Sequence, residues 1–438
     1  MVETPKFTDE QLQVPRLGEP QHASPLRRST APGQGRGCFV PDDMRVLYEP
    51  RYSAGGQPAQ VGLERAGPRE RIYFDPAQVK AAVVSCGGLC PGINNVVRSL
   101  VHELRLNYGV PKVLGIRFGY RGLNPEQARP PIDLSLEAVE AIHHMGGTIL
   151  GTSRGHQDPA VTTEYLRSQG VNILFCIGGD GTQRGAHAIA AEAARQGLDI
   201  AVVGVPKTID NDIKFCFRTF GFYTAVAEAE KVIDRAHIEA KAVLNGVGLV
   251  KLMGREAGFI AAAAAVASGE ANFVLIPEVP LTLEGDDGFL ARLERRLLAR
   301  EHAVVVVAEG AGQHLMETDP EEADASGNRR LGDIGPLLKE RIREHFAERQ
   351  IPVGVKYFDP SYHIRSAPAS AADSFYCQEL ARSAVHAGMA GKTDLLIGLW
   401  HNHLVHVPLA ISTGMKKRLS PEGELWTAVL AATGQESL

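Results

Sequence analysis

Short apolar runs alternate with longer segments of mixed apolar and polar character from residue 79 onward. Each run is followed by Gly, Pro or Asp, and the segments between the runs have the spacing of amphipathic helices. The predicted strands cover residues 81–85, 112–116, 173–177 and 200–205. The predicted helices cover residues 94–106, 136–145, 162–169 and 187–196. This alternation predicts a parallel sheet covered by helices.

The same alternation returns in the second half of the chain, after a long predicted helix at residues 223–240. Further strands are predicted at 246–252, 273–277 and 303–308, and further helices at 254–268, 288–301 and 335–349. The acidic segment 317–332 is predicted to be an exposed insertion. We find no short tandem repeat, which argues against a solenoid. A second α/β sheet is therefore expected.

The first 78 residues have a different character. They are rich in Pro, Gly, Gln and Arg and show little apolar periodicity, so they are predicted to form an extended arm or a partly disordered extension. Two short apolar pieces, 44–48 and 71–74, could dock on the body of the protein or on a partner subunit.

Length and composition restrict the class of protein. The chain has 438 residues, of which 44% are hydrophobic and 22% charged, enough for a large core and two to four domains. The net charge of -5 argues against broad nucleic-acid binding, so positive charge for anionic ligands must be local. No run of about 18 apolar residues and no signal-peptide core occur. We expect a soluble, cytoplasmic protein without membrane contact.

The six cysteines are too few for a disulfide scaffold. Cys86 and Cys90 lie four residues apart, but no matching Cys or His pair accompanies them. Structural zinc sites need a spaced set of four ligands. Both residues are therefore predicted to be ordinary thiols.

Two Gly-rich segments, 86–92 (CGGLCPG) and 177–182 (IGGDGT), each follow a predicted strand and precede a helix. Glycines let the backbone approach a phosphate, and a helix N-terminus supplies free N–H groups. Asp180 could hold Mg²⁺ beside phosphate oxygens, and Thr182 could bind phosphate. The alternatives are a tight turn without a ligand for the first segment and a helix cap for Asp180.

A third segment, 205–212 (VPKTIDND), places two carboxylates and an ammonium group after a strand. Asp210 and Asp212 resist simultaneous ionisation unless a cation such as Lys207 or Mg²⁺ intervenes. One carboxylate could then accept a proton from a substrate hydroxyl. A turn rich in Asp and Asn is the alternative.

Basic residues lie in three further segments, at 151–155 (GTSRG), 253–255 (MGR) and 356–365 (KYFDPSYHIR). Guanidinium groups match the geometry of phosphate oxygens. Each arginine alone is typical of a surface charge. Together, in a chain of net negative charge, they predict local phosphate sites.

These motifs resemble the 6-phosphofructokinase family, and in particular its mixed-substrate clade of plant and trypanosomal ATP-dependent enzymes. The matching segments occur in family order over about residues 79–414. They are GGLCPGINNVVRSL from 87, FGYRGL from 118, GTSRG from 151, IGGDGT from 177, PKTIDND from 206, MGREAGFIA from 253, AEG from 308 and KYFDPSYHIR from 356.

The resemblance implies an α/β fold with two Rossmann-like three-layer α/β/α domains, parallel-rich sheets and an active site in the cleft between them. The expected division is an N-terminal arm (1–78), a larger ATP-binding domain (79–221 and 364–414), a smaller fructose 6-phosphate-binding domain (222–363) and a C-terminal tail (415–438). Relatives imply a homotetramer or homodimer in which neighbouring subunits share basic residues.

The resemblance also implies a reaction, the transfer of the γ-phosphoryl group of ATP to the 1-hydroxyl of fructose 6-phosphate. It makes Asp210 the general base, places Arg154 near the transferred phosphate and makes Asp180 the Mg²⁺ ligand. The implied donor-site residues are Gly88, Tyr120, Arg154, Gly155, Gly179, Asp180, Gly181, Thr182 and Gly185. The implied acceptor-site residues are Lys207, Thr208, Ile209, Asp210, Asp212, Met253, Gly254, Arg255, Glu309, Lys356, Tyr362, His363, Ile364 and Arg365.

Two positions bear on the phosphoryl donor. Pyrophosphate-dependent relatives carry an aspartate where this chain has Gly181, and the missing bulk and charge favour ATP. Lys207 favours pyrophosphate, because the simplest bacterial ATP enzymes have Gly there. A pyrophosphate-dependent enzyme is therefore the main alternative. A non-catalytic sugar-phosphate sensor, or a nicotinamide-dinucleotide or lipid kinase sharing GGDGT, are others.

Overall fold

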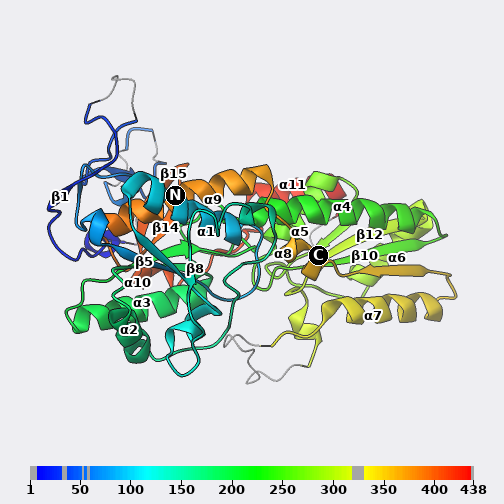
Figure 1. Cartoon of the computed structure of the whole chain (residues 1–438). Helices are drawn as coiled ribbons and strands as arrows, with labels where there is room; N and C mark the ends of the chain where they lie inside the picture. Colours follow the sequence, from blue (N-terminus) through cyan, green and yellow to red (C-terminus); the bar gives the residue numbers. More distant parts are fainter. Residues whose placement is uncertain (1–6, 32–36, 52–53, 57–59, 318–329, 436–438) are drawn as a thin grey trace. The chain divides into compact units, whose positions relative to one another are not determined.

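The computed structural model describes residues 7–31, 37–51, 54–56, 60–317 and 330–435. Its chain divides into two compact units (Figure 1). The first unit comprises Met1–Thr208, Ile213–Gly221 and Pro368–Met415, and the second comprises Ile209–Asp212, Phe222–Ala367 and Lys416–Leu438. The domain limits expected from the sequence stay predictions, and they did not anticipate that residues 209–212 join the second unit.

The first unit is built on a nine-stranded sheet in the order β2-β3-β15-β14-β9-β8-β5-β6-β7. Its five parallel strands are β6 (Lys112–Ile116), β5 (Lys80–Ser85), β8 (Ile173–Gly178), β9 (Ala201–Pro206) and β14 (Leu395–Trp400). The antiparallel flanking strands are β2 (Arg45–Leu47), β3 (Gly62–Arg65), β15 (His403–Pro408) and β7 (Ile132–Asp133). The four strands predicted for this half of the chain are confirmed to within one residue at each end.

Helices cover both faces of this sheet (Figure 1). On one face α1 (Ile93–His102), which continues as a π-helical segment (Glu103–Tyr108), packs against α9 (Ala371–Met389). On the other lie α2 (Pro159–Ser168) and α3 (Asp180–Arg195), whose Leu166 and Ile189 join a core with Leu174 of β8. Alternate residues of each buried strand thus face the two helical layers. The short helix α10 (Leu409–Ser412) follows β15.

The N-terminal segment, expected to be an extended arm or a partly disordered extension, contributes strands to the first unit. Its strands β2 and β3 extend the main sheet, and β1 (His22–Ala23) pairs with β4 (Arg71–Ile72). Glu64 of β3 is buried and accepts hydrogen bonds from Arg69 at 2.7 Å and from Lys392, while His406 Nδ1 lies 3.2 Å away. This ion network joins residues distant in sequence, so composition did not reveal it. Residues 1–6, 32–36, 52–53 and 57–59 lie outside the described residues.

The sequence also predicts a helix at 136–145 and an exposed insertion at 317–332. The helix predicted at 136–145 is wrong, since only the 3-10 turn Ile142–His144 forms there. Leu136 and Met145 are 39% and 55% exposed, so the segment lacks a continuous apolar face. Most of the insertion predicted at 317–332 falls at 318–329, outside the described residues.

The second unit contains a four-stranded parallel sheet in the order β11-β12-β10-β13. The strands are β10 (Gly246–Leu252), β11 (Phe273–Leu275), β12 (His302–Ala308) and β13 (Gly354–Phe358). The helices are α4 (Phe222–Lys241), α5 (Phe259–Ser268), α6 (Phe289–Arg300), α7 (Ile334–Glu348), α8 (Ser361–Ser366) and α11 (Glu424–Thr433). Figure 1 shows α4 and α7 on opposite faces of the sheet. Of these elements, β13, α8 and α11 were not predicted.

Alternation along β10 explains how helices approach this sheet from both sides. Val247 and Leu249 join the core with α6 and α7. Gly246 and Gly248 face α4, where a Cβ would lie 2.0 Å from the Ala240 carbonyl oxygen and 2.6 Å from that of Ala236. Glycine therefore permits close contact between α4 and the strand. Within the described residues, no helix is long and apolar enough to cross a membrane.

We predict that Gly246→Ala lowers the free energy of unfolding by about 1–3 kcal/mol, because its methyl group has no room beside α4. Urea unfolding followed by circular dichroism measures the change. Gly414→Ala is the matched control, since a Cβ there meets nothing within 4 Å, and it should change stability by less than about 0.5 kcal/mol. Equal losses in the two variants would contradict the packing argument.

Candidate functional site

The site residues predicted from the sequence are divided between the two units. The first unit holds Gly88, Tyr120, Arg154, Gly155, Gly179, Asp180, Gly181, Thr182, Gly185, Lys207 and Thr208. The second unit holds Ile209, Asp210, Asp212, Met253, Gly254, Arg255, Glu309, Lys356, Tyr362, His363, Ile364 and Arg365.

In the first unit, loops that follow neighbouring parallel strands are tied together by Lys207. This residue comes directly after β9, and its main-chain N–H donates to the Gly178 carbonyl of β8 at 3.0 Å. Its ammonium donates to the Gly88 carbonyl after β5 at 2.5 Å, and the residue is only 5% exposed. Carboxyl ends of parallel strands are the usual place for ligands. Lys207 thus supports the Gly-rich loop from inside the protein.

The loop containing Arg154 joins the same edge through backbone contacts. Gly87 donates its N–H to the Ser153 carbonyl at 3.0 Å, and the Thr152 hydroxyl donates to the Gly87 carbonyl at 2.6 Å. A Cβ on Gly88 would lie 3.8 Å from the Arg154 guanidinium. The structure therefore brings the predicted CGG and GTSRG segments together.

A small cavity lies beside the start of α3. Four predicted residues line it, together with residues that the sequence did not single out: Tyr120, Gly155, Gly181 and Gly185, with His156, Gln157, Pro159, Thr162, Ala188 and Ile189. The Tyr120 hydroxyl donates to the Thr182 carbonyl at 2.6 Å. A Cβ on Gly185 would lie 2.5 Å from the Tyr120 ring, whereas one on Gly181 would approach no atom closer than 3.9 Å. Gly185 thus makes room for the ring, and Gly181 keeps the cavity open.

Asp180 is the first residue of α3, where its negative charge interacts favourably with the positive end of the helix dipole. The described residues contain no group of three His, Cys, Asp or Glu side chains that could hold a metal ion. A single carboxylate suits Mg²⁺, which usually keeps several waters and binds substrate phosphates. The donor set around Asp180 therefore fits a metal ion that arrives with a phosphorylated ligand.

Cys86 and Cys90 are both buried, and none of the six cysteines, all within the described ranges, forms a disulfide. Burial raises the pKa of the Cys86 thiol to about 12. The Cys90 thiol donates to the Phe220 carbonyl, with the sulfur 3.2 Å from the oxygen. These contacts agree with the expected role as ordinary thiols.

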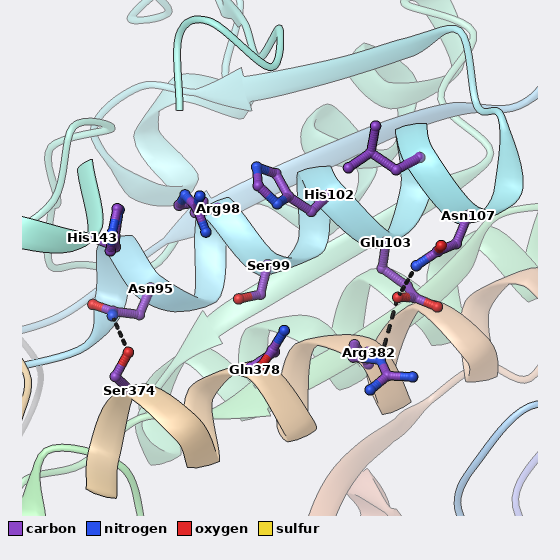
Figure 2. A pocket seen from close by; sticks show the side chains of 11 residues that line it. Asn95, Arg98, Ser99, His102, Glu103, Asn107, His143, Ser374, Gln378 and Arg382 are labelled. Atoms are coloured by element: carbon purple, nitrogen blue, oxygen red, sulfur yellow. Dashed lines mark hydrogen bonds and ion pairs between the residues drawn. The ribbon is translucent and has the colours of Figure 1, made fainter. Parts of the chain in front are cut away.

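A larger cavity of about 400 Å³ lies elsewhere in the first unit, between α1, its π-helical extension and α9 (Figure 2). Glu103, 3% exposed, accepts a hydrogen bond from Asn107 at 2.6 Å and pairs with Arg382 at 3.3 Å. Asn95 donates to the Ser374 hydroxyl at 2.9 Å. No predicted site residue lines this cavity. Its polar residues recur at helical spacing and form no local motif, so they were not singled out from the sequence.

In the second unit, the Asp210 carboxylate is buried and its pKa is strongly raised. Burial raises its pKa well above the ordinary value, and the negative charges of Asp212 and Glu309 add to this effect. The Arg255 main-chain N–H, which donates to the carboxylate, and the Lys416 ammonium act in the opposite direction. Perturbed acids of this kind are candidates for proton transfer.

The carboxyl ends of the second sheet supply the surroundings of this group. Met253 follows β10 and Glu309 follows β12. Gly254 adopts a φ of 129°, and a Cβ there would lie 2.7 Å from the Ala257 carbonyl oxygen. Burial raises the pKa of Glu309, while Arg255, among other cations, lowers it. Positive and negative groups therefore lie together at this edge.

Lys251, near the end of β10, joins the same edge and was missed by the sequence analysis. Its ammonium lies 2.9 Å from carboxylate oxygens of both Asp333 and Asp359. Burial disfavours its charge, but these two carboxylates outweigh that effect and raise its pKa. The available signal was a charged residue inside an otherwise apolar strand, GVGLVKL.

The segment 356–365 is less uniform than its motif implied. The Arg365 guanidinium lies 4.3 Å from the centre of the Tyr362 ring, which belongs to a residue that is 71% exposed. Lys356 and His363 are also exposed. Ile364 is 1% exposed, so its side chain belongs to the interior, and its expected part in the acceptor site stays a prediction.

Comparison with known proteins identifies the family. The family model described as Phosphofructokinase matches residues 80–388, well over half of the chain. The chain belongs to the phosphofructokinase family. The resemblance expected from the sequence motifs is thereby confirmed.

Two curated members of this family match nearly the whole chain. A protein named ATP-dependent 6-phosphofructokinase from Borreliella burgdorferi is 46% identical over 432 residues, covering 97% of this chain and 96% of that protein. One with the same name from Trypanosoma brucei brucei is 44% identical over 435 residues, covering 97% and 88%. The trypanosomal match agrees with the expected clade.

Among solved structures, a pyrophosphate-dependent phosphofructokinase from Marinobacter aquaeolei matches with a TM-score of 0.68 and 23% identity. The match covers 82% of this chain and 93% of that one. At this identity the likeness shows the fold alone, which is the α/β phosphofructokinase fold.

We predict that Lys251→Met lowers the free energy of unfolding by about 1–3 kcal/mol, because it leaves two carboxylates facing each other. The estimate lies at the low end for a buried ion pair, since Asp333 is 55% exposed. Urea unfolding at neutral pH measures the effect. The exposed pair Lys231–Glu228 on α4 gives the control Lys231→Met, which should cost less than about 0.5 kcal/mol. A loss no larger than the control would refute this role for Lys251.

Proposed function

We propose that the protein is an ATP-dependent 6-phosphofructokinase. It would transfer the γ-phosphoryl group of ATP to the 1-hydroxyl of D-fructose 6-phosphate, giving fructose 1,6-bisphosphate and ADP. The structural observation that carries this proposal is the buried Asp210 carboxylate, whose pKa is raised and which accepts the Arg255 main-chain N–H. The names of the near-full-length relatives supply the substrates.

In this proposal Asp210 is the general base on the sugar hydroxyl. A carboxylate of ordinary pKa, about 3.9, is a weak base, so the raised pKa favours proton acceptance. Phosphoryl transfer depends mostly on positioning and on stabilising charge. Asp210 would orient the hydroxyl and take its proton as the bond to phosphorus forms. Arg154 would place positive charge near the transferred phosphate.

On the donor side, Asp180 would hold Mg²⁺, which when bound neutralises charge on the phosphate oxygens. Gly88 and the 179–182 loop would bring backbone N–H groups to the phosphates. Their position after parallel strands supports this assignment.

On the acceptor side, Glu309 would accept hydrogen bonds from sugar hydroxyls, and Arg255 would contribute positive charge beside it. Tyr362, Arg365 and Lys356 would bind the 6-phosphate. Guanidinium groups suit this role because their fork matches phosphate oxygens. Lys356 is exposed, as a residue shared with a neighbouring subunit would be in the isolated chain.

Gly181 supports ATP over pyrophosphate as donor, and the contacts of Lys207 weaken the argument for pyrophosphate. Gly181 leaves space at the cavity beside α3 and adds no negative charge. Lys207, which argued for pyrophosphate, donates to the Gly88 carbonyl and is nearly buried, so its presence has a structural explanation. The presence of Asp210, Asp180 and Arg154 argues against a non-catalytic sensor.

The proposal includes a homotetramer or homodimer in the cytoplasm. Light scattering of the purified protein tests the oligomer. A coupled assay of fructose 6-phosphate with either ATP or pyrophosphate tests the reaction. Turnover with pyrophosphate and none with ATP would overturn the choice of donor.

We predict that Asp210→Asn lowers kcat by about 10²–10⁴-fold, the usual contribution of a general base. The variant should remain folded. Because the folded pKa of Asp210 lies above its unfolded value, the ionised group costs stability once the pH exceeds that unfolded value. The melting temperature at neutral pH should therefore stay equal or rise. Full turnover in this variant would remove Asp210 from its assigned role.

We predict that Gly181→Asp raises the KM for ATP by at least about tenfold, because its carboxylate would repel the nucleotide phosphates. The KM for fructose 6-phosphate should change little. Gly181→Ala is the control for bulk, since a Cβ there meets no atom within 3.9 Å, and it should change the KM for ATP less than twofold. An unchanged KM for ATP in Gly181→Asp would contradict the account of donor choice.

A further inference from the structure

The segment 416–419, just before α11, contacts the loop that carries Asp210. The main-chain N–H of Lys417 donates to the Asp212 carbonyl at 2.8 Å. Its ammonium donates to the Asn211 side-chain oxygen, also at 2.8 Å. One residue therefore holds two of the four residues of the Ile209–Asp212 segment, and all of these groups belong to the second unit.

The loop needs such support because of its backbone conformation. Asn211 has a φ of 57°, in the left-handed region, and is only 5% exposed. Asparagine tolerates this conformation better than most residues, but a buried amide oxygen still requires a donor. Lys417 supplies that donor.

A second lysine connects the same segment to the other side of Asp210. The Lys416 ammonium pairs with Glu256 at 2.5 Å, next to Arg255, whose main-chain N–H donates to the Asp210 carboxylate. Among the charged groups that act on Asp210, Asp212 and Glu309 raise its pKa and Lys416 lowers it. Lys416 is the cation among them, and its charge stabilises the ionised carboxylate.

The segment is itself anchored beyond the lysines. The Leu419 N–H donates to Glu278 at 2.8 Å, and the same carboxylate accepts the Gly258 N–H before α5 at 3.0 Å. Further along, Gln435 exchanges two hydrogen bonds with Val274 of β11. The lysines thus extend from a fixed stretch of chain.

From these contacts we infer that residues 416–419 form a positioning strap, in which Lys417 holds the general-base loop in place and Lys416, paired with Glu256 beside Arg255, adds positive charge on that side of Asp210. These lysines are positioning residues, since they act through Asn211, Asp212 and Asp210 rather than on substrate. The inference rests on the proposed phosphotransferase function. It assigns to the C-terminal segment a part in kcat that is separate from ligand affinity.

The first test is Lys417→Met, which removes the ammonium and keeps a side chain of similar length. We expect kcat to fall about 10–100-fold, because small displacements of a reacting group carry costs of this size. The KM values for ATP and fructose 6-phosphate should stay within about twofold. Lys231→Met, on the exposed face of α4, is the control and should behave like the wild type. An unchanged kcat in Lys417→Met would overturn the proposal.

A double-mutant cycle separates positioning from a general loss of stability. Asn211→Gly removes the acceptor but keeps a residue that tolerates the left-handed backbone. If the two side chains act as a unit, the double variant should have a kcat no lower than the slower single variant. Losses that multiply would show that the lysine acts by another route.

The pH profile tests Lys416. Loss of its charge should raise the pKa of Asp210 further, so Lys416→Gln should move the acidic limb of the kcat profile to higher pH. Lys416→Arg should leave that limb in place. An acidic limb that is the same in Lys416→Gln and the wild type would refute the role of this lysine.

Hydrogen exchange keeps the inference testable apart from the proposed function. Peptides containing residues 209–212 should exchange faster in Lys417→Met than in Lys231→Met, whether or not the protein turns over fructose 6-phosphate. Wild-type protein without turnover on ATP or pyrophosphate would defeat the proposed function alone. Equal exchange in the two variants would defeat the strap.

Discussion

A buried aspartate with other carboxylates beside it keeps its charge only where the protein supplies hydrogen bonds and cations. Asp210 is held in that way, between the negative charges of Asp212 and Glu309 and the opposing Arg255 N–H and Lys416 ammonium. The balance depends on where the loop lies. The Ile209–Asp212 segment belongs to the second unit and is contacted there by Lys417, although the residues on either side belong to the first unit.

The predicted phosphate sites of the first unit contain few charged side chains. Glycines lie at the carboxyl ends of its strands, where we propose that phosphates bind, and the Lys207 ammonium donates to the Gly88 carbonyl. A net charge of -5 is compatible with the proposed phosphorylated ligands, because only a few of the 46 basic residues, such as Lys207, need to lie at the strand ends.

Much of the fold was predictable because strands buried on both faces read as continuous apolar runs. The predictions at 112–116 and 246–252 match β6 and β10 residue for residue. Strands β2 and β3 were missed because they lie at one side of the sheet and depend on contacts of Glu64 with Lys392 and His406. The helix predicted at 136–145 does not form, because this segment lacks a continuous apolar face.

The residues of the candidate site also differ in how well the sequence predicts them. Motifs contiguous in sequence, such as 206–212 and 253–255, could be found by their spacing and by resemblance. Lys417 could not, because its partners lie far away in the chain, and the only signal for Lys251 was a charged residue inside an apolar strand. Sequence patterns describe what a segment can do, and long-range contacts decide the charge and position of its groups.

A titration of the Asp210 carboxyl group tests this account most directly. Infrared or carbon-13 NMR titration of the wild type, with Asp210→Asn as the reference, isolates its carboxyl signal from those of Asp212 and Glu309. The account predicts that this signal titrates well above the ordinary value of about 3.9. A carboxyl group that titrates at or below that value would contradict the account, because it could not be the tuned base described here.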